Sequence, residues 1–376
     1  MPADRRLILW TTPHTLHVQH SLQNEISQCL QTKIFQKLLS ATSDASRQSY
    51  GAGLLRFTQF CDRENISEAL RMPASVILLS AFIADAVGSC TGQCIRNWIN
   101  GLRLWHLYNR ADWHGKDSWI TTLSKSANRE GVPFKRPPHN PITRLHLLTL
   151  RHHLNLSSPR DAAIWFTALA AFSSCQRLSE LLIRSPRSFS LQHDTTRGTA
   201  ISTSCVNGHK VVMFHLIWTK STGIHGGECI LTAMNDLLCP VWALENHFHI
   251  NNISDHDAPL SAFGTGSTWS HLSKDQFLKI TSGIYNSSHL DIVLGHSYRI
   301  GGSVHLLIMG VAPEIIMKLG GWTSLCFLLY WRHLELIVPL AITRAWVSQQ
   351  RAFVKKFNIA NASFDSSSDM SFDLAI

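Results

Sequence analysis

Apolar residues recur at helical spacing in the first third of the chain. Between residues 42 and 65, Tyr50, Leu54 and Phe57 fall on one side of a helix that has 3.6 residues per turn. The stretch 72–88 has a proline in a first-turn position and a glycine at its end, and it is largely apolar. Proline is favoured at the start of a helix and glycine just after its end, and a helix that is apolar all round is buried. Both segments are therefore predicted to be helices of one packed domain.

The next predicted helix, residues 93–109, has an apolar face and a basic face. Leu102 and Trp105 share the apolar face, which is expected to pack against the domain. Between residues 91 and 136, eight Lys or Arg stand against three acidic residues. The basic positions that are candidates for nucleic-acid binding are Arg96, Arg103, Arg110, Lys125 and Arg129. A solvated surface and a surface that follows DNA phosphates both explain this pattern, and the charges alone leave both open.

Proline and charge mark a division of the chain near residue 138. Residues 135–141, KRPPHNP, hold three prolines and suit an extended linker better than a helix or a strand. Beyond two further helical stretches, the alternating, β-branched segments 198–204 and 210–218 predict a β-hairpin. Helices resume from about residue 270, so the fold class is expected to be α+β and mainly α. The expected parts are a poorly ordered leader without clear periodicity (1–40), a helical domain (41–138), a mixed α/β domain with a small sheet (141–357) and a flexible acidic tail (358–376).

The composition is that of a globular chain with a basic surface. The 376 residues are 45% hydrophobic, which is enough for two packed cores, and the net charge of +9 favours a polyanionic partner. We find no long apolar run and no secretory leader, so a soluble intracellular protein without a membrane partner is expected. Nine cysteines are scattered without a CxxC pair, which indicates neither a disulfide framework nor a zinc ribbon.

Several polar residues of the second domain have the chemistry of phosphate binding, although each also has an ordinary structural explanation. Arg177 lies one turn before Glu180 near the end of an apolar helix, where a surface ion pair would suffice. Lys220 is expected to end the second strand of the hairpin, a common place for a lysine. His296 and Arg299 lie three positions apart at a helix start, so both side chains can reach one cluster of oxygen atoms.

Two aromatic residues follow a proline-initiated helix and a double glycine near the end of the second domain. Trp322 comes directly after Gly320 and Gly321, and Tyr330 lies eight residues further on. Taken alone, both are explained as core aromatics, because such side chains are usually buried.

The order of these motifs resembles that of the tyrosine recombinases, also called the phage-integrase family. The resemblance runs from about residue 41 to residue 357. RMPASVILLSAFI, GLRLWH, HSYRIGGSVHLLIMGV and GGWTSLCFLLYWR are similar to segments of the Crypton-type recombinases of fungal genomes. A single HxxR is common, whereas the ordered set is specific. The resemblance implies a helical core-binding domain of the SAM-like type, followed by a mixed catalytic domain.

The resemblance also implies a reaction and a set of residues that performs it. The enzyme would break and rejoin DNA through a 3′-phosphotyrosyl intermediate, without a metal, ATP or another cofactor, in the integration or recombination of a mobile element. Two arginines would stabilise the charge on the phosphate oxygens, the histidine would assist proton transfer, the tryptophan would pack, the tyrosine would attack and the lysine would protonate the leaving 5′ oxygen. The catalytic residues implied are Arg177, Lys220, His296, Arg299, Trp322 and Tyr330, with Glu180 orienting the arginines.

The implied partners are double-stranded DNA and further copies of the chain, as a dimer or tetramer on DNA, and the implied location is the nucleus. The segment 333–357 is amphipathic and would dock on a neighbouring copy or pack on its own domain. One departure concerns the spacing from Trp322 to Tyr330, which is eight residues here and nine in many bacterial members. It puts the role of Trp322 in doubt more than that of Tyr330.

Alternatives remain open at the level of sequence. Lys210 competes with Lys220 as the general acid, and only the geometry of the hairpin separates them. The chain would also fit an inactive DNA-binding remnant of a mobile element, or a relaxing enzyme similar to the type IB topoisomerases. A metal enzyme that uses histidines of residues 247–256 is a weaker alternative, because no known zinc spacing occurs there.

Overall fold

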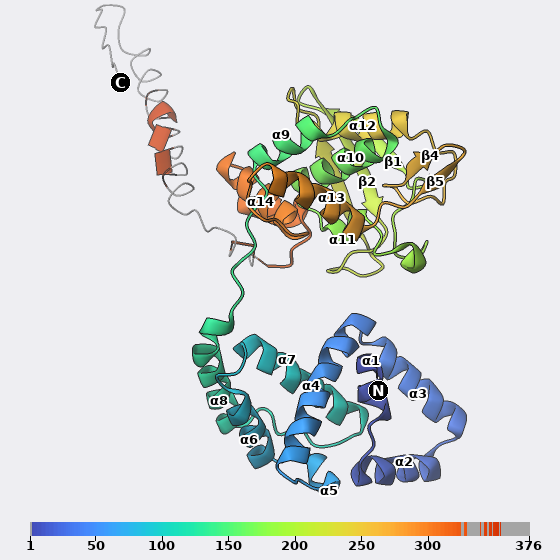
Figure 1. Ribbon diagram of the computed structural model, residues 1–376, viewed down its shortest axis with the longest axis vertical. Helices are drawn as coiled ribbons and strands as arrows, with labels where there is room; N and C mark the ends of the chain where they lie inside the picture. The colour runs from blue at the N-terminus through green and yellow to red at the C-terminus, as the bar shows by residue number, and fades with distance from the viewer. Residues whose placement is uncertain are drawn as a thin grey trace, which may run out of the picture. The chain divides into compact units, whose positions relative to one another are not determined.

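The computed structural model divides into two compact units, Met1–Pro137 and Pro138–Ile376, and the division falls within the predicted linker (Figure 1). The residues that it describes are 2–324, 327–328, 339, 342–343, 346–347, 349–352 and 354. Tyr330 and the predicted tail 358–376 therefore lie outside the described residues. None of the described helices is long and apolar enough to cross a membrane.

The described regular structure of the first unit is helical. Its elements are α1 (Ala3–Leu9), α2 (Pro13–Glu25), α3 (Gln28–Ser40), α4 (Asp44–Arg63), α5 (Glu68–Arg71), α6 (Val76–Ala86), α7 (Gly92–Tyr108), α8 (Ser118–Glu130) and the 3-10 turn η1 (Val132–Phe134). Hydroxyl groups of Ser43, Ser75 and Thr91 cap α4, α6 and α7 by accepting a backbone N–H of the first turn. The cap at Ser75 places Pro73 before the helix, so the expectation that Pro73 lies in its first turn is wrong.

Helices α4 and α7 form the centre of this unit. Leu54 and Phe57 of α4 and Leu102 and Trp105 of α7 are fully buried, as the helical periodicity predicts. The two backbones approach closely at Gly101, where an added Cβ would lie 2.4 Å from the carbonyl oxygen of Tyr50. A larger residue at this position would force the helices apart.

Residues 3–40 correct the expectation of a poorly ordered leader, because they form α1, α2 and α3. Leu7 of α1 is buried in the core of α4 and α7, and the Trp10 ring stacks on Trp105 with 4.2 Å between ring centroids. The periodicity was weak because α1 is short and because Thr15 is the buried residue of the largely polar α2.

The second unit combines helices with small antiparallel sheets, which confirms the prediction of a mainly helical α+β chain. The helices described in it are α9 (Arg144–His153), α10 (Pro159–Ser173), α11 (Leu178–Leu181), the 3-10 turn η2 (Pro186–Ser188), α12 (Pro240–Ile250), α13 (Lys274–Ser287), α14 (Ser297–Ile308) and α15 (Pro313–Leu319). Its strands are β1 (Ile201–Val206), β2 (His209–Leu216), β3 (Gly227–Thr232), β4 (Phe263–Thr265) and β5 (Thr268–Ser270). Helix α10 lies in the core, with Trp165 and Phe166 fully buried.

The predicted hairpin is confirmed as β1 and β2, whose register pairs Ser204 with Val211. Asn207 and Gly208 form its turn with positive φ angles of 51° and 80°, the conformation that two-residue hairpin turns require. Strand β3 pairs antiparallel with the other edge of β2 and completes a three-stranded sheet in the order β1-β2-β3. This third strand was not predicted.

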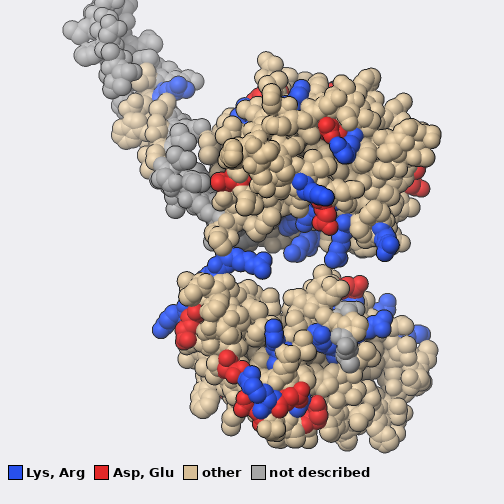
Figure 2. Space-filling model, in the orientation of Figure 1, with Lys and Arg blue, Asp and Glu red and all other residues tan. Residues whose placement is uncertain are grey.

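Charged side chains are distributed differently on the two units. On the face drawn in Figure 2, Lys and Arg gather along one edge of the second unit, whereas on the first unit they are mixed with Asp and Glu. The mixed charges include the ion pair between Arg63 and Asp85 (2.6 Å).

Candidate active site

Arg177 and Glu180 form a close pair at the start of α11. The backbone N–H of Arg177 donates to Glu180 Oε2 (3.0 Å), and Arg177 Nη1 donates to Glu180 Oε1 (2.8 Å). The Glu180 side chain is only 1% exposed and that of Arg177 is 21% exposed. The surface ion pair that would have explained these residues is thus excluded, since the carboxylate is buried and orients the arginine.

Lys220 lies in the loop that joins β2 to β3, beyond the end of the strand where the sequence placed it. Backbone bonds in both directions between Thr219 and Gly223 close this loop (2.9 and 3.2 Å). The Lys220 N–H donates to Glu180 Oε1 (3.2 Å), and Arg177 Nη2 donates to Ser221 Oγ (3.1 Å). The Arg177–Glu180 pair therefore holds the loop from two sides, while the Lys220 side chain stays exposed.

Lys210, the competing lysine, lies near the other end of β2. It is paired with Cys205 in the strand register and forms an ion pair with Glu245 of α12. Both side chains of that ion pair are about half exposed. The structure therefore brings Lys220, and not Lys210, to Arg177.

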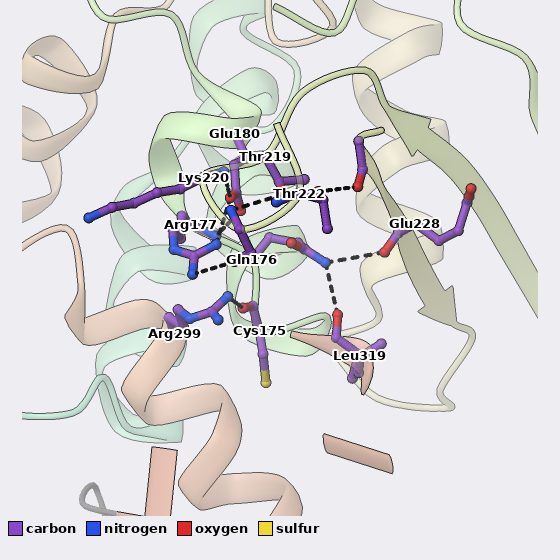
Figure 3. A network of polar contacts seen from close by, with 12 residues as sticks. Cys175, Gln176, Arg177, Glu180, Thr219, Lys220, Thr222, Glu228, Arg299 and Leu319 are labelled. Atoms are coloured by element: carbon purple, nitrogen blue, oxygen red, sulfur yellow. Dashed lines mark hydrogen bonds and ion pairs between the residues drawn. The ribbon is translucent and has the colours of Figure 1, made fainter. Parts of the chain in front are cut away.

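His296 is the N-cap residue of α14, and Arg299 lies in the first turn of this helix. Arg299 is fully buried, and its Nη1 donates to the carbonyl oxygen of Cys175 (2.6 Å), the residue two positions before Arg177. The guanidinium carbon of Arg299 lies 3.6 Å from the centroid of the Trp322 ring, a cation–π contact. Figure 3 shows the guanidinium groups of Arg177 and Arg299 on the same side of the chain segment that carries Arg177.

The pKa of His296 is lowered by burial and by neighbouring positive charges. Burial has the largest effect, followed by Arg299, His139, Arg177 and Lys220, and together they lower the pKa from its ordinary value of 6.5 to about 4. Three of the predicted cations therefore act on this imidazole. The imidazole is neutral at neutral pH.

Trp322 is mostly buried in a small cluster with Phe327, whose ring centroid lies 4.9 Å away. Gly321 has a positive φ of 62°, and the Trp322 N–H donates to the carbonyl oxygen of Met317 (2.9 Å). This turn places the indole ring on Arg299. Trp322 therefore packs on Arg299. Tyr330 lies outside the described residues.

Sequence reasoning missed His139 and Gln176 as neighbours of the site. His139 belongs to the predicted linker, and three residues later the Ile142 N–H donates to the carbonyl oxygen of Ser297 (3.0 Å), which lays the end of the linker along α14. Gln176 immediately precedes Arg177 and is 4% exposed. The signal available in the sequence was a glutamine directly before Arg177, after a long apolar stretch.

The basic residues of the first unit are accessible, with one correction to their placement. Arg96 and Arg103 are exposed on α7 two turns apart, and Lys125 and Arg129 are exposed one turn apart on α8. Arg110 lies beyond the end of α7 with a positive φ of 50°, so it does not continue the basic helix face. In the described part of the chain, none of these five side chains forms an ion pair with an acidic group.

An open groove of about 740 Å³ lies beside Arg103, between the start of α4 and the second half of α7. Asn100 and Lys116 line it together with hydroxyl groups of Ser43 and Ser46. Cationic and hydroxyl groups are the side chains that proteins commonly use to contact DNA phosphates.

In the histidine-rich segment 247–256, His247 has a structural role. His247 is fully buried, its Nε2 bonds with the carbonyl oxygen of Leu260 (2.9 Å), and its Nδ1 bonds with Asn251 Nδ2 (3.0 Å). Burial lowers its pKa to about 3. Among the described residues, no cluster of His, Cys, Asp or Glu is arranged to hold a metal ion.

Neither a family model nor a curated protein sequence matches the chain. Among solved structures, the chain is similar to the XerH site-specific recombinase bound to its difH substrate, with 13% identity over 87% of this chain and 89% of that chain and a TM-score of 0.49. It is also similar to the Tn1549 transposon integrase in complex with a circular intermediate DNA, with 10% identity over 90% and 100% of the two chains and a TM-score of 0.46. The XerA recombinase has 13% identity over 82% and 93% of the two chains and a TM-score of 0.35.

Proposed function

We propose that the chain is a DNA strand transferase of the tyrosine-recombinase type. The observation that carries the proposal is the set of hydrogen bonds that brings Arg177, the Lys220 loop and Arg299 together, with positive charges that also act on the neutral imidazole of His296. Several cations in one site suit the negatively charged pentavalent transition state of phosphoryl transfer better than any neutral substrate. The predicted order of motifs along the chain supports the same reaction.

The distribution of tyrosines supports Tyr330 as the nucleophile. The chain has five tyrosines, and Tyr50 and Tyr108 belong to the first unit. Tyr285 and Tyr298 are buried in the core of the second unit, where their hydroxyl groups bond to each other (3.1 Å) and burial raises the pKa of Tyr298 to about 12. Neither is suited to attack a phosphate, so Tyr330 remains as the candidate.

In the proposed reaction the Tyr330 oxygen attacks the phosphorus while the bond from phosphorus to the 5′ oxygen breaks. Neutral His296 accepts the phenol proton, and the Lys220 ammonium donates a proton to the departing 5′ oxygen. Arg177 and Arg299 stabilise the charge of the transition state on the nonbridging oxygens, which is the role of metal ions in other phosphoryl transfers. Attack of a 5′ hydroxyl on the phosphotyrosine reverses these steps and restores a phosphodiester without ATP.

The burial of Arg299 sets a condition on this mechanism. Its guanidinium is covered by Trp322 on one face and bonded to Cys175 on an edge. A DNA phosphate reaches it only if part of the covering chain is displaced, so we expect DNA binding to rearrange the Trp322 turn.

We further propose that the first unit is the core-binding domain and that its exposed Arg96, Arg103, Lys125 and Arg129 follow DNA phosphates. Pairs or tetramers on DNA, a Crypton-type mobile element as the source and a nuclear location follow from the sequence resemblance. They are part of the proposal.

A covalent adduct tests the proposed function. The full-length protein is incubated with a nicked suicide duplex whose sequence has been selected from random DNA, and a protease-sensitive protein–DNA adduct is expected. Arg177→Ala and Arg299→Ala should each slow adduct formation about a hundredfold, or about 3 kcal/mol. Arg144→Ala is a matched control, because Arg144 is an arginine of the second unit that forms an ion pair with Asp236 (2.6 Å), and it should react at the wild-type rate. A wild-type protein that binds this DNA but forms no adduct is an inactive remnant, and one that relaxes supercoiled DNA without exchanging partners is a topoisomerase.

A further inference from the structure

Three consecutive residues before α11 contact three different parts of the candidate site. The carbonyl oxygen of Cys175 accepts from Arg299, and the guanidinium of Arg177 donates to Ser221 in the Lys220 loop. Gln176 lies between them with a buried side chain, and the proposed reaction gives it no part.

The amide group of Gln176 bridges two segments that are far apart in the sequence. Its Nε2 donates to the carbonyl oxygen of Glu228 (3.3 Å) and to the carbonyl oxygen of Leu319 (3.1 Å). Figure 3 shows this amide extending away from the side on which the two guanidinium groups lie. An amide nitrogen carries two hydrogens, so one side chain serves both carbonyl groups.

Each of these carbonyl groups belongs to a segment that presents a predicted catalytic residue. Glu228 is the second residue of β3, which follows directly on the loop that carries Lys220. Leu319 is the last residue of α15, and the turn after it places Trp322 on Arg299. Neither the loop nor the turn belongs to the segment that carries Gln176, so the bridge sets their positions relative to it.

We propose that Gln176 is a positioning residue, which holds the Lys220 loop and the Trp322 turn at fixed places beside the two arginines. The inference rests on the proposed function and extends it, because it explains why one buried amide connects two segments that carry predicted catalytic residues. Gln176 acts through Lys220 and Trp322 and does not contact DNA.

The chemistry of the two contacts determines which substitutions of Gln176 test the proposal. Both partners are carbonyl oxygens, which only accept hydrogen bonds, so the side chain must donate twice. Gln176→Met keeps the length and the apolar volume and removes both donors. Gln176→Asn keeps both donors on a side chain that is one methylene shorter and cannot span both carbonyl groups. If Gln176→Met does not fold, Gln176→Asn tests the positioning role instead.

Gln31 provides a matched control in the first unit. Its Nε2 also donates to two backbone carbonyl oxygens, those of Leu22 (3.1 Å) and Ile26 (2.9 Å), and its side chain is similarly buried. Gln31→Met therefore removes the same pair of bonds without touching the candidate site.

The first readout is hydrogen exchange of the DNA-free, full-length protein. In Gln176→Met, amide exchange should be about fivefold faster or more in residues 217–228 and 317–324, because each segment loses a tether. Gln176→Asn should accelerate at least one of the two segments, and Gln31→Met should accelerate neither. Wild-type exchange in both segments of the Gln176 variants overturns the proposal.

The second readout is the rate of adduct formation on two versions of the selected nicked duplex, one with the natural bridging 5′ oxygen and one with sulfur in its place. Sulfur leaves without a proton, so it removes the need for Lys220. Gln176→Met should react about tenfold to a hundredfold more slowly than wild type on the oxygen substrate, and sulfur should restore the part of the rate that is lost through Lys220 but not the part lost through the Trp322 turn. Lys220→Ala is the reference for full rescue. A wild-type rate on the oxygen substrate refutes the positioning role, and an equal loss on both substrates refutes the positioning of Lys220.

Failure of this inference is distinct from failure of the proposed function. If the wild-type protein forms no adduct on either substrate, the proposed function is wrong, and the exchange measurement still decides whether Gln176 holds the two segments. If the wild type reacts and the Gln176 variants match it, only the role of Gln176 is wrong.

Discussion

Replacing Glu180 with glutamine should damage both the stability of the second unit and its proposed chemistry. The two carboxylate oxygens of Glu180 accept three hydrogen bonds, from the backbone N–H and Nη1 of Arg177 and from the N–H of Lys220. Glutamine has the same shape but one acceptor oxygen, and its NH₂ group would face a donor. At least one of the three bonds is therefore lost in either orientation of the amide.

The size of the effect follows from the burial of the carboxylate. A hydrogen bond to a charged group contributes about 1.5–3 kcal/mol, and a donor left buried without an acceptor adds to the loss. We expect Glu180→Gln to lower the free energy of unfolding by about 2–3 kcal/mol. Adduct formation should slow about tenfold to a hundredfold, because Arg177 and the Lys220 loop lose their common anchor.

Urea unfolding followed by circular dichroism measures the first effect, and single-turnover adduct formation measures the second. Glu245→Gln is the matched control, because Glu245 pairs with Lys210 and both side chains are about half exposed. It should cost less than about 1 kcal/mol and leave the rate unchanged. If the two variants lose equal stability and react at equal rates, Glu180 does not orient the site and the reasoning is refuted.

Three further predictions concern DNA binding, metal ions and protonation. Arg96→Ala and Arg103→Ala should each weaken binding equally on all sequences and reduce the slope of log affinity against log salt by about one, and unchanged slopes in both would remove α7 from the interface. EDTA should leave adduct formation intact, whereas loss of activity that magnesium or zinc restores would contradict the arginine mechanism. In NMR titrations of the DNA-free protein, His296 should titrate near its pKa of about 4, and Lys220→Ala should raise that pKa by removing a positive charge; a wild-type pKa of 6.5 or above would contradict the burial of His296 among positive charges, and an unchanged pKa in Lys220→Ala would contradict the effect of that lysine. Since this native pKa lies below 6.5, the unfolded state binds the proton more tightly, and stability should fall as the pH drops from about 6.5 to about 4.

Local signals predicted the parts of the fold that depend on local physics. The faces of α7 and the hairpin of β1 and β2 follow from the spacing of apolar residues and from turn chemistry, which a single segment contains. Residues 3–40 and β3 were missed because α2 has a weak apolar pattern and β3 follows an irregular loop. Their positions depend on burial against distant segments.

The candidate site was predictable as a set of residue types but not as an arrangement. The order of motifs singled out Arg177 and Arg299. The choice of Lys220 over Lys210 required the structure, which shows that the two lysines lie toward opposite ends of β2 and that the Lys220 loop, unlike Lys210, contacts Glu180. The contact of Gln176 with Leu319 joins residues 143 positions apart. A contact at such a separation leaves no periodic trace in the sequence.

The identity of the attacking residue tests the central claim most directly. The covalent adduct on the selected nicked duplex is digested, and the peptide that carries the nucleotide is identified by mass spectrometry. The account predicts that this peptide contains Tyr330, and that Tyr330→Phe binds the same DNA with unchanged affinity and forms no adduct, because it lacks only the attacking oxygen. An adduct that persists in Tyr330→Phe, or that maps to Tyr285 or Tyr298, would contradict the account.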